Sequence, residues 1–488
     1  MISLKLILKN IEIEKIAGSM DTNIEIENLT YDSRTATFKS LFIAIRGNSY
    51  DGHNYIESAI ENGACAIVCE ELPKKISPSV SYILTKDSHY SLGVIASNYY
   101  NNPSNKIKLV GITGTNGKTT TVTLLYNLFT DLGYKCGLIS TIENYVGKVR
   151  VEATHTTPDP LSLNNLLYQM NLEGCEYCFM EVSSHALSQE RVSGLTFYGA
   201  IFSNITHDHL DYHKTFIEYI KAKKRLFDTL DKNAFALINS DDKNGETMIQ
   251  NCNAKVYRYS THSPADFNCK IVEKGMDGMQ LNIGGTEIWS RFIGEHNAYN
   301  LLAVYATAIL LNAQHDQVLT SLSKMGSVAG RLEYTKGAED LTVFVDYAHT
   351  PDALENVLKT LNDSSQGREL ITVFGCGGNR DRSKRPKMGQ IAAKYSTKIV
   401  VTSDNPRFED PDLIIEEIKE GLTAVERMRA LFITDRREAI RTAIAIAPKE
   451  AVILIAGKGH ETYQDINGIK SHFDDMEIVK EFLNQKIV

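Results

Sequence analysis

A glycine-rich run between an apolar segment and a helix-like segment is the part of the chain best suited to chemistry. The run GITGTNGKTTT fills residues 111–121, after the apolar residues 107–110 and before VTLLYNLFTDLG. A glycine-rich turn between a strand and a helix presents backbone N–H groups at the helix N-terminus, which is a cradle for phosphate. Lys118 would reach the outer phosphates and Thr119 would ligate Mg²⁺. The run therefore predicts that the chain binds a nucleoside triphosphate.

One position departs from the common phosphate-loop pattern. That pattern has a glycine five places before its second conserved glycine, whereas this chain has Ile112 there and a glycine at Gly114. A turn that only packs a helix on a strand is the alternative interpretation. Lys118 and Thr119 follow Gly117 directly, with a strand-like and a helix-like segment on either side, and this arrangement favours the phosphate-binding loop.

Polar residues that suit a metal site follow two other apolar segments. Glu181 ends the segment CFME, and a carboxylate at a strand end beside a phosphate loop suits Mg²⁺, directly or through water. The stretch NITHDHLDYH carries His207, His209 and His213. Their spacing matches no usual zinc pattern. We therefore expect His207 and His213 on surface loops, and a metal-binding or positioning role for His209.

The last third of the chain carries arginines and a carboxylate that suit a small charged substrate. Arg380 and Arg382 lie in GCGGNRDRSKRP, and Arg407 lies in DNPRFEDP, where Asn-Pro predicts a rigid turn. Arginine forks bind carboxylate or phosphate in bidentate fashion. Glu461 and His460 follow the tight turn GKG. Each charge alone is equally consistent with a surface loop, but arginine and glutamate facing one cleft would suit a zwitterionic substrate.

Strand-like segments alternate with helical ones around these polar groups, which is typical of an α/β fold with a mostly parallel sheet. Ligands bind at the carboxyl ends of the strands in such sheets, where we expect these groups to lie. A chain of 488 residues suggests about three domains, and the polar segment NNPSN predicts the first boundary. We expect domains over residues 1–105, 106–330 and 331–488. The expected core strands are 109–113, 177–182, 200–204, 341–346, 370–375, 398–402 and 451–456.

Composition limits the class of protein. Hydrophobic residues make up 43% and charged residues 23% of the chain, as in ordinary globular proteins. A net charge of −8 gives no reason to expect nucleic acid as a partner. The sequence has no apolar run long enough to span a membrane and no secretory signal, so we expect a cytoplasmic protein. The eight cysteines are too sparse for a disulfide scaffold, and the CxxC pair Cys175 and Cys178 lacks a second pair to complete a zinc site.

Several segments resemble, in the same order, those of the Mur ligases of bacterial cell-wall synthesis. They are TGTNGKTT, EVSSHAL, NITHDHLDYH, GRLE, DYAHTPDAL, GCGGNRDRSKRPKMG, DNPR and GKGHE, and the resemblance covers nearly the whole chain. It implies an N-terminal domain that binds a UDP-sugar and a central P-loop ATPase domain with a parallel sheet. It also implies a C-terminal Rossmann-like domain that binds an amino acid. A monomer that uses ATP and Mg²⁺ and acts on small molecules is expected.

The resemblance implies an ATP-dependent ligase of peptidoglycan precursor synthesis that joins an acid to an amino acid through an acyl phosphate. The DNPR box is similar to that of relatives that add meso-2,6-diaminopimelate to UDP-N-acetylmuramoyl-L-alanyl-D-glutamate, whereas lysine-adding relatives depart from it. Addition of L-lysine is one alternative. A folylpolyglutamate synthase-like ligase is another, although that enzyme lacks the DNPR and GKGHE context. The combination of Lys118, Glu181 and His209 argues against a nucleotide-dependent switch or a non-catalytic binding protein.

The resemblance also changes the interpretation of Lys223. Pattern alone places Lys223, with its charged neighbours Lys221, Lys224 and Arg225, on a solvated basic helix face. The resemblance instead implies a carbamylated lysine that helps to hold Mg²⁺. The implied catalytic residues are Lys118, Glu181, His209 and Lys223, and the implied metal-binding residues are Thr119, Glu181, His209 and Lys223 as carbamate.

The remaining implied roles concern the three substrates. Arg380 and Arg407 would bind the distal carboxylate that diaminopimelate has and lysine lacks, while Gly457 and Glu461 would bind the adjacent ammonium. The diaminopimelate site would comprise Arg380, Asp404, Asn405, Pro406, Arg407, Gly457 and Glu461. ATP would contact Gly114, Thr115, Asn116, Gly117, Lys118, Thr119, Thr120, Asn297, Arg331, Asp346 and His349. The UDP-sugar peptide would contact Tyr31, Ser33, Asn48, Ser49, Tyr50, Thr156, Thr157, Ser183, Gln189, Arg191 and His155, the last at a place where relatives often have asparagine.

Overall fold

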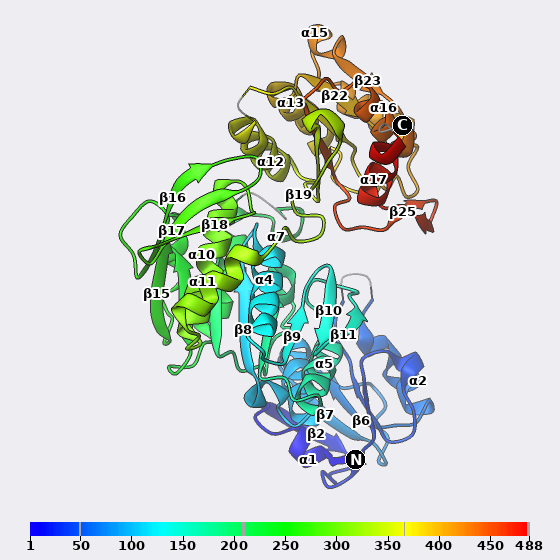
Figure 1. The fold of residues 1–488 in the computed structure, drawn as a ribbon. Helices are drawn as coiled ribbons and strands as arrows, with labels where there is room; N and C mark the ends of the chain where they lie inside the picture. Colours follow the sequence, from blue (N-terminus) through cyan, green and yellow to red (C-terminus); the bar gives the residue numbers. More distant parts are fainter. Residues whose placement is uncertain (48–49, 207–209, 366, 486–488) are drawn as a thin grey trace. The chain divides into compact units, whose positions relative to one another are not determined.

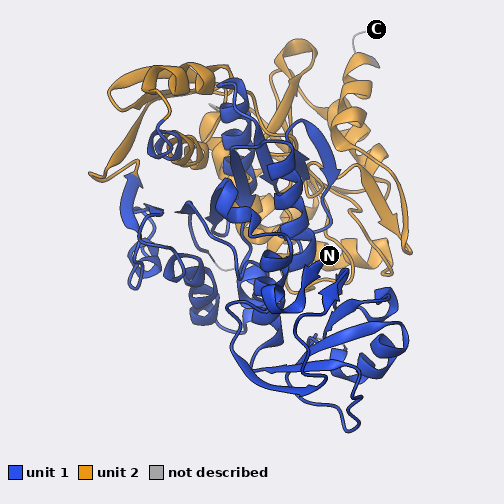
Figure 2. Ribbon diagram, turned by 90° about the horizontal axis from the view of Figure 1, so that it is seen from below, with its two compact units in different colours: residues 1–259, 306–312 blue, residues 260–305, 313–488 orange. Residues whose placement is uncertain are grey.

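The computed structural model describes the chain except residues 48–49, 207–209, 366 and 486–488. The chain forms two compact units, which Figure 2 colours separately. The first comprises residues 1–259 and 306–312, and the second comprises residues 260–305 and 313–488. The domain boundaries expected at 105/106 and 330/331 divide the chain more finely and stay predictions. Among the described residues, no helix is long and apolar enough to cross a membrane, and each of the eight cysteines is a free thiol.

The N-terminal part of the first unit is a five-stranded sheet with an apolar core on each face. Leu41 and Ile43 belong to one core and Phe42 to the other, as the alternation of side chains along a strand requires. Neighbouring strands are parallel except for the first pair in the strand order. That order is β2 (Ile13–Gly18), β7 (Ser81–Thr85), β6 (Ala64–Cys69), β5 (Ser40–Ile43) and β4 (Asn28–Thr30). The other elements here are β1 (Ile2–Ser3), α1 (Leu4–Ile7), β3 (Glu25–Ile26), η1 (Ser33–Thr35), η2 (Gly52–Tyr55), α2 (Ile56–Glu61) and α3 (Ser88–Tyr99).

The central part of the first unit is a larger sheet whose core strands are parallel, as predicted (Figure 1). Residues 109–113 are all buried, because a strand in the middle of a parallel sheet is covered on both faces. The two strands at one edge are antiparallel to their neighbours. In order, the strands of this unit are β11 (Val149–Glu152), β10 (Glu143–Val146), β9 (Cys136–Ile139), β12 (Tyr177–Glu181), β8 (Lys108–Thr113), β13 (Gly199–Phe202), β14 (Phe235–Asn239) and β15 (Lys255–Ser260).

Capping residues determine where several helices around this sheet begin. Asp159 accepts hydrogen bonds from the backbone of Leu161 and Ser162, with proline in the first helical turn. Ser183 and Thr215 cap two further helices through their hydroxyl groups. The elements are η3 (Pro103–Lys106), α4 (Lys118–Asp131), α5 (Pro160–Leu172), α6 (Ser184–Ser188), α7 (Leu210–His213), α8 (Phe216–Asp228) and α9 (Gly245–Met248).

The second unit holds an antiparallel meander and a six-stranded, mostly parallel sheet. Among the described strand pairs of the larger sheet, only the pair formed by residues 333–336 and 342–346 is antiparallel. Helices α12 (Pro351–Ser364), α13 (Lys384–Tyr395) and α14 (Pro411–Lys419) share one core, and α16 (Arg436–Ile446) and α17 (Asp475–Gln485) share the other, as in a doubly wound, Rossmann-like fold. The sheet order is β19 (Glu333–Lys336), β20 (Thr342–Asp346), β24 (Val452–Ala456), β21 (Leu370–Phe374), β22 (Lys398–Val401) and β23 (Ala430–Phe432). The other elements are β16 (Phe267–Lys274), β17 (Met279–Ile283), β18 (Thr286–Ser290), α10 (Glu295–Leu310), α11 (His315–Lys324), η4 (Ala338–Asp340), α15 (Ala424–Arg427), β25 (Tyr463–Ile466) and β26 (Ile469–His472).

A buried ion pair ties two helices of the second unit to the carboxyl ends of its strands. Arg436 at the start of α16 donates from Nε and Nη2 to the two oxygens of Asp475 at 2.8 and 2.7 Å. Both side chains are completely buried. The same guanidinium also donates to the carbonyls of Ser403 and Ala456. Arg436 thereby fixes the backbone just beyond β22 and at the end of β24.

Asp475→Asn should lower the free energy of unfolding by about 3–5 kcal/mol, because it leaves the buried guanidinium of Arg436 without its counter-charge. Glu481→Gln is the matched control, since Glu481 lies on the same helix and pairs with the neighbouring Arg437. That pair exposes 42% and 44% of its side chains, so its loss should cost less than about 1 kcal/mol. Denaturant unfolding measures both, and equal losses would contradict the role assigned to burial.

Candidate active site

The phosphate loop between β8 and α4 has a conformation that only glycine tolerates at two places. Gly114 has φ +153° and Gly117 has φ +87°. A Cβ on Gly114 would lie 1.9 Å from the hydroxyl oxygen of Ser203, which is shorter than any real contact. Ser203 and Asn204, beyond the end of β13, both donate to the carbonyl of Asn116, at 2.7 and 3.1 Å. The strand next to β8 therefore holds the loop in shape.

Two lysine ammonium groups meet at one backbone carbonyl of this loop. Lys118 Nζ and Lys223 Nζ donate to the carbonyl oxygen of Gly114 at 2.9 and 2.6 Å. Lys118 also donates to the carbonyl of Thr115. The side of the loop where phosphate would bind therefore carries two positive charges. Thr119 and Thr120 are buried in the first turn of α4.

The interpretation of Lys223 from sequence pattern alone is wrong. Lys223 is only 1% exposed, and its Nζ lies 4.6 Å from the centre of the Tyr219 ring. Lys224 is also buried, whereas Lys221 is exposed. The helix α8 therefore turns one lysine of the KAKK run inward onto the phosphate loop. The expectation of a surface position for His213 is wrong as well, because His213 is 7% exposed and packs against Tyr219.

Glu181 supplies the feature that fits a divalent cation. It ends β12, which is paired with β8, and its residue is 1% exposed. One carboxylate oxygen accepts a hydrogen bond from the backbone N–H of Thr141 at 2.8 Å. The other, Oε2, is buried with no hydrogen-bond partner among the described residues. A buried carboxylate oxygen without a donor is unfavourable, and a hard cation such as Mg²⁺ would satisfy it. His209, the other expected ligand, lies outside the described residues.

Several of the residues expected to bind the sugar peptide form one hydrogen-bonded group beyond β12. Thr157 donates to the carbonyl of Glu181 at 2.8 Å and accepts from the backbone N–H of Ser183. Arg191 donates to the carbonyl of Thr157 at 2.7 Å and to the side-chain oxygen of Gln189 at 2.7 and 3.0 Å. This group is thus fixed in place directly beside Glu181.

Tyr31 of the N-terminal sheet region lies in the same electrostatic environment. Burial raises the pKa of Tyr31, Asp159 raises it further, and Arg191 opposes both. Burial lowers the pKa of Arg191. Tyr31 and Arg191 thus lie close enough for their charges to interact. The other expected contacts have different surroundings. Thr156 accepts from Thr141, Ser33 is buried and its carbonyl accepts from Asn62, and His155 and Tyr50 are exposed. Asn48 and Ser49 lie outside the described residues.

In the second unit, Asp346 fixes the backbone next to two other residues expected to face the nucleotide, Arg331 and His349. Its two oxygens accept from the backbone N–H groups of Leu332 and Ala348, both at 2.8 Å. Burial raises the pKa of Asp346, and the nearby guanidinium of Arg331 opposes this. The pKa of His349 is lowered by partial desolvation and by the positive charge of Lys384, although the residue keeps an exposed surface. Asn297 is buried and donates its side-chain amide to the carbonyl of Ile293, which precedes α10.

An aromatic stack links Arg331 to the GKGHE loop. The guanidinium carbon of Arg331 lies 5.0 Å from the centre of the Tyr347 ring, and His460 packs against that ring at 4.8 Å. Burial and the charge of Arg331 lower the pKa of His460 to about 3, so this histidine is neutral at physiological pH. Gly330, whose Cβ would lie 2.1 Å from the backbone nitrogen of His460, allows the two segments to touch.

A buried polar cluster forms the other side of the expected amino-acid site. Asn405 donates to the carboxylate of Glu461 at 2.8 Å and accepts from Lys458 at 3.1 Å. Lys458 is completely buried and lies 3.3 Å from the same carboxylate. Burial raises the pKa of Glu461, Lys458 opposes this, and Asp404 adds to it. Gly457 is in contact with Asp404, since a Cβ there would lie 2.4 Å from the carboxylate oxygen. Asp404, Asn405, Gly457 and Glu461 are thus brought together, as expected.

The side chains of the two arginines expected to bind the distal carboxylate both pass close to Gly377. A Cβ on Gly377 would lie 2.9 Å from Nη1 of Arg407 and 3.9 Å from Cγ of Arg380. Arg407 is partly buried and donates to the carbonyl of Gly378 at 2.8 Å, whereas Arg380 is exposed. Pro406 precedes Arg407, and its carbonyl would clash with any side chain at Gly378. The glycines of GCGG therefore make room for the DNPR loop.

Comparisons with known proteins agree with this geometry. Three family models match the chain in order: Mur ligase family, catalytic domain at residues 25–103, Mur ligase middle domain at 112–308, and Mur ligase, glutamate ligase domain at 330–459. A protein of Cytophaga hutchinsonii named UDP-N-acetylmuramoyl-L-alanyl-D-glutamate--2,6-diaminopimelate ligase is 54% identical over 97% of this chain and 98% of its own. This chain belongs to the Mur ligase family.

Further Mur ligases match over the same length. The protein of the same name from Bacteroides thetaiotaomicron is 51% identical over 98% of this chain and 99% of its own. A solved structure of a ligase with this name is 31% identical, with a TM-score of 0.70, and the match covers 100% of this chain and 99% of that one. As a Mur ligase, the protein is an ATP-dependent ligase that forms peptide bonds and uses Mg²⁺. Its α/β fold has the N-terminal, middle and C-terminal domains of the family.

Sequence reasoning missed four polar residues of this Mur ligase site. The backbone of Thr141 donates to the carboxylate of Glu181, Tyr219 contacts Lys223, and Asp159 raises the pKa of Tyr31. Lys458 is buried against Asn405 and Glu461. The signal for Lys458 was its position inside GKGHE, between two glycines that permit a tight turn. The other three had no local signal, because only the fold brings them to their partners.

Gly114→Ala should abolish nucleotide binding by this Mur ligase, because the new Cβ would overlap Ser203 and force the phosphate loop out of shape. Gly133→Ala is the matched control. Gly133 also has positive φ, at +92°, but a Cβ there meets nothing within 4 Å, so it should cost only about 1 kcal/mol of stability. Titration with ADP and thermal unfolding of both variants test this. Unchanged ADP affinity in Gly114→Ala would show that the loop can relax around the clash.

Proposed function

We propose that the protein adds meso-2,6-diaminopimelate to UDP-N-acetylmuramoyl-L-alanyl-D-glutamate at the expense of ATP. The observation that carries this proposal is the placement of Arg380 and Arg407 together, in a unit that also buries a cluster around Glu461. Two guanidinium groups suit a carboxylate, and a buried carboxylate suits an ammonium. Diaminopimelate has a second carboxylate and ammonium beyond the reacting amine, and lysine has no second carboxylate. The names of the two relatives above support the same substrates.

The proposed reaction has two steps. The γ-carboxylate of the D-glutamate residue attacks the γ-phosphorus of ATP, giving an acyl phosphate and ADP. The amine of diaminopimelate then attacks the acyl carbon and expels inorganic phosphate, with loss of a proton from nitrogen. No side-chain nucleophile takes part, so the protein contributes positioning and charge stabilisation. Lys118, which lies at the loop carbonyls of Gly114 and Thr115, would turn to the transferred phosphate.

Mg²⁺, when bound, would neutralise phosphate oxygens during transfer. Glu181 offers a buried and unsatisfied carboxylate oxygen. Thr119 lies in the first turn of α4, directly after the phosphate loop. We propose Thr119, Glu181, His209 and Lys223 as the metal-binding residues. Lys223 would act as a carbamate, which converts a buried cation into an anionic oxygen ligand. Its position at the carbonyl of Gly114 supports this role.

The sugar peptide would bind beside Glu181, where Thr157, Ser183, Gln189 and Arg191 form one hydrogen-bonded group. Arg191 would offer its guanidinium to a carboxylate or phosphate of this substrate. The roles proposed for Tyr31, Ser33, Asn48, Ser49, Tyr50, His155 and Thr156 rest on the family resemblance. So do the nucleotide contacts of Gly114 to Thr120, Asn297, Arg331, Asp346 and His349.

We also propose a cytoplasmic monomer that works on small molecules alone. Its nucleotide and UDP-linked substrates are cytoplasmic compounds, and the net charge of −8 gives no attraction for nucleic acid. We also propose domain boundaries at 105/106 and 330/331. The family models end at residue 103 and begin again at 112 around the first boundary, and the last model begins at residue 330, next to the second.

Phosphate release by the purified protein should require the UDP-dipeptide and meso-diaminopimelate together with ATP. L-lysine in place of diaminopimelate should give far slower release, because a site built for an ionic partner rejects an analogue without it by about 10⁴-fold. A panel of amino acids, with folate and glutamate as a further pair, separates the alternatives. Preference for lysine, for the folate pair, or release without any acceptor would each refute the proposal.

Arg407→Ala should lower kcat/KM for meso-diaminopimelate by about 10²-fold or more, because it removes one partner of a hydrogen-bonded charge pair. Residual activity with L-lysine should change little. Arg382→Ala is the control, since Arg382 lies in the neighbouring loop but is directed to Glu417 and exposes 64% of its side chain. Equal losses with both amino acids would show that Arg407 does not recognise the distal carboxylate.

Glu181→Gln should raise the Mg²⁺ concentration needed for half-maximal ligation by at least about 10-fold, because a neutral amide replaces an anionic ligand. Glu143→Gln changes a carboxylate of the same sheet that pairs with Arg150 instead, and it should leave the Mg²⁺ dependence unchanged. Ligation rates measured across a range of Mg²⁺ concentrations give the comparison. An unchanged dependence in Glu181→Gln would remove Glu181 from the metal site.

A further inference from the structure

The backbone at Arg407 is held in a conformation that arginine rarely adopts. Its φ is +52°, in the left-handed region, which is unfavourable for a residue that has a Cβ atom. Such a conformation persists only where surrounding contacts over-determine it. The backbone N–H of Arg407 donates to the carbonyl of Asp465, and its carbonyl accepts from Asn467. The hairpin β25–β26 therefore fixes Arg407 from one side.

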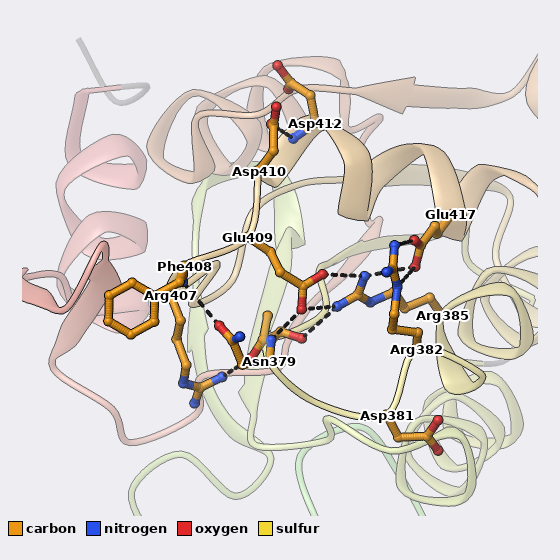
Figure 3. A network of polar contacts seen from close by, with 12 residues as sticks. Asn379, Asp381, Arg382, Arg385, Arg407, Phe408, Glu409, Asp410, Asp412 and Glu417 are labelled. Carbon is orange, nitrogen blue, oxygen red and sulfur yellow. Dashed lines mark hydrogen bonds and ion pairs between the residues drawn. The ribbon is translucent and has the colours of Figure 1, made fainter.

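The other side of the DNPR loop is fixed by a buried arginine that does not belong to the proposed substrate site. Arg385, on α13, is completely buried. Figure 3 shows its guanidinium between two carboxylates, Glu409 and Glu417. It donates to Glu409 at 3.0 and 3.1 Å and to Glu417 at 2.8 Å. It also lies 3.4 Å from the carbonyl of Gly377, the glycine that the side chains of the two substrate arginines pass close to.

Glu409 connects this arginine to both substrate loops. It lies two residues after Arg407, and its carboxylate accepts from the backbone N–H of Asn379, the residue before Arg380. The side chain of Asn379 in turn accepts from the backbone N–H of Phe408 at 3.1 Å. Arg407 itself donates to the carbonyl of Gly378, which adds a third hydrogen bond between the two loops. Figure 3 shows this chain of contacts running from Arg385 to Arg407.

We propose that the Arg385–Glu409 pair is a positioning device that sets the spacing of Arg380 and Arg407 and so determines affinity for the distal carboxylate of the amino acid. The inference rests on the proposed function and deepens it. Neither Arg385 nor Glu409 is among the residues proposed to bind the amino acid. They act by joining the GCGGN loop to the DNPRFE loop at the residues adjoining the two substrate arginines. Binding then needs little rearrangement, which is how pre-organised sites gain affinity.

Glu417 offers a closely matched control. Glu409 and Glu417 both pair with Nη1 of Arg385, and their side chains are 23% and 22% exposed. Both oxygens of each carboxylate accept hydrogen bonds, those of Glu417 from Arg385 and Arg382. A glutamine at either place must therefore turn an amide N–H toward another donor. The difference is that, of the two loops, Glu417 on α14 contacts only the one that carries Arg380, through Arg382, while Glu409 joins that loop to the DNPRFE loop.

The test compares Glu409→Gln with Glu417→Gln in the full-length enzyme. Glu409→Gln should raise the KM for meso-diaminopimelate by about 10-fold or more, since a small misplacement of a binding group has large effects. Its kcat at saturating diaminopimelate and its KM for ATP should stay near those of the unaltered enzyme. Glu417→Gln should leave the KM for diaminopimelate within about 2-fold of the starting value, with a loss of thermal stability similar to that of Glu409→Gln.

Each outcome of this comparison decides the proposal. Equal KM values for diaminopimelate in both variants, or a loss in Glu409→Gln that appears in kcat and in the KM for ATP instead, would overturn it. Arg385→Lys provides a second measurement, because lysine keeps the charge but cannot bridge both loops, so the KM should rise here too. If the unaltered enzyme releases no phosphate with diaminopimelate, the proposed function itself fails, and the inference fails with it.

Discussion

The carbonyl group of Gly114 is the point on which the first unit depends. It accepts from both Lys118 and Lys223, whose positions are more than a hundred residues apart in the chain. Gly114 can adopt this conformation because glycine tolerates a φ of +153° and because it has no Cβ, which would clash with the hydroxyl group of Ser203. A mutation that shifts this peptide would therefore move the phosphate loop and α8 together. The residues proposed to bind phosphate and those proposed to bind the metal are therefore joined through this one carbonyl.

Glu181, at the end of the strand paired with β8, has one satisfied and one unsatisfied oxygen. The backbone of Thr141 fixes the carboxylate through Oε1, so Oε2 keeps a single direction. Burial of an unpaired anionic oxygen is unfavourable for the protein alone. The same arrangement favours a cation once one is bound, since the carboxylate needs no reorganisation. The unpaired oxygen thus costs free energy in the free protein, and a cation bound at Glu181, as proposed above, would remove that cost.

The sequence predicted the parts of the molecule whose signals are local. Apolar segments ending in polar clusters gave the strands β8, β12, β13, β20, β21, β22 and β24, and these are confirmed. Lys223 shows where such reasoning stops. Three charged neighbours suggested a solvated face, yet a lysine faces inward when a carbonyl from a distant loop is available. His213 was misplaced for the same reason, because its aromatic neighbours come partly from α8. The loop geometry at Gly114 and Gly377 required coordinates, since a glycine-rich run does not reveal which glycine is crowded.

Two buried arginines in the second unit have a common role. Arg436 donates to the carbonyls of Ser403 and Ala456, the residues directly before Asp404 and Gly457 of the proposed amino-acid site. Arg385 lies at the carbonyl of Gly377 and at Glu409, beside the two substrate arginines. A buried ion pair is often no better for stability than apolar residues of the same size. Apolar residues could not hold backbone carbonyls, however, and hydrogen bonds have directions that packing lacks. The strand ends and loops that bear the proposed substrate contacts are therefore fixed by charged groups that lie outside the proposed contacts themselves.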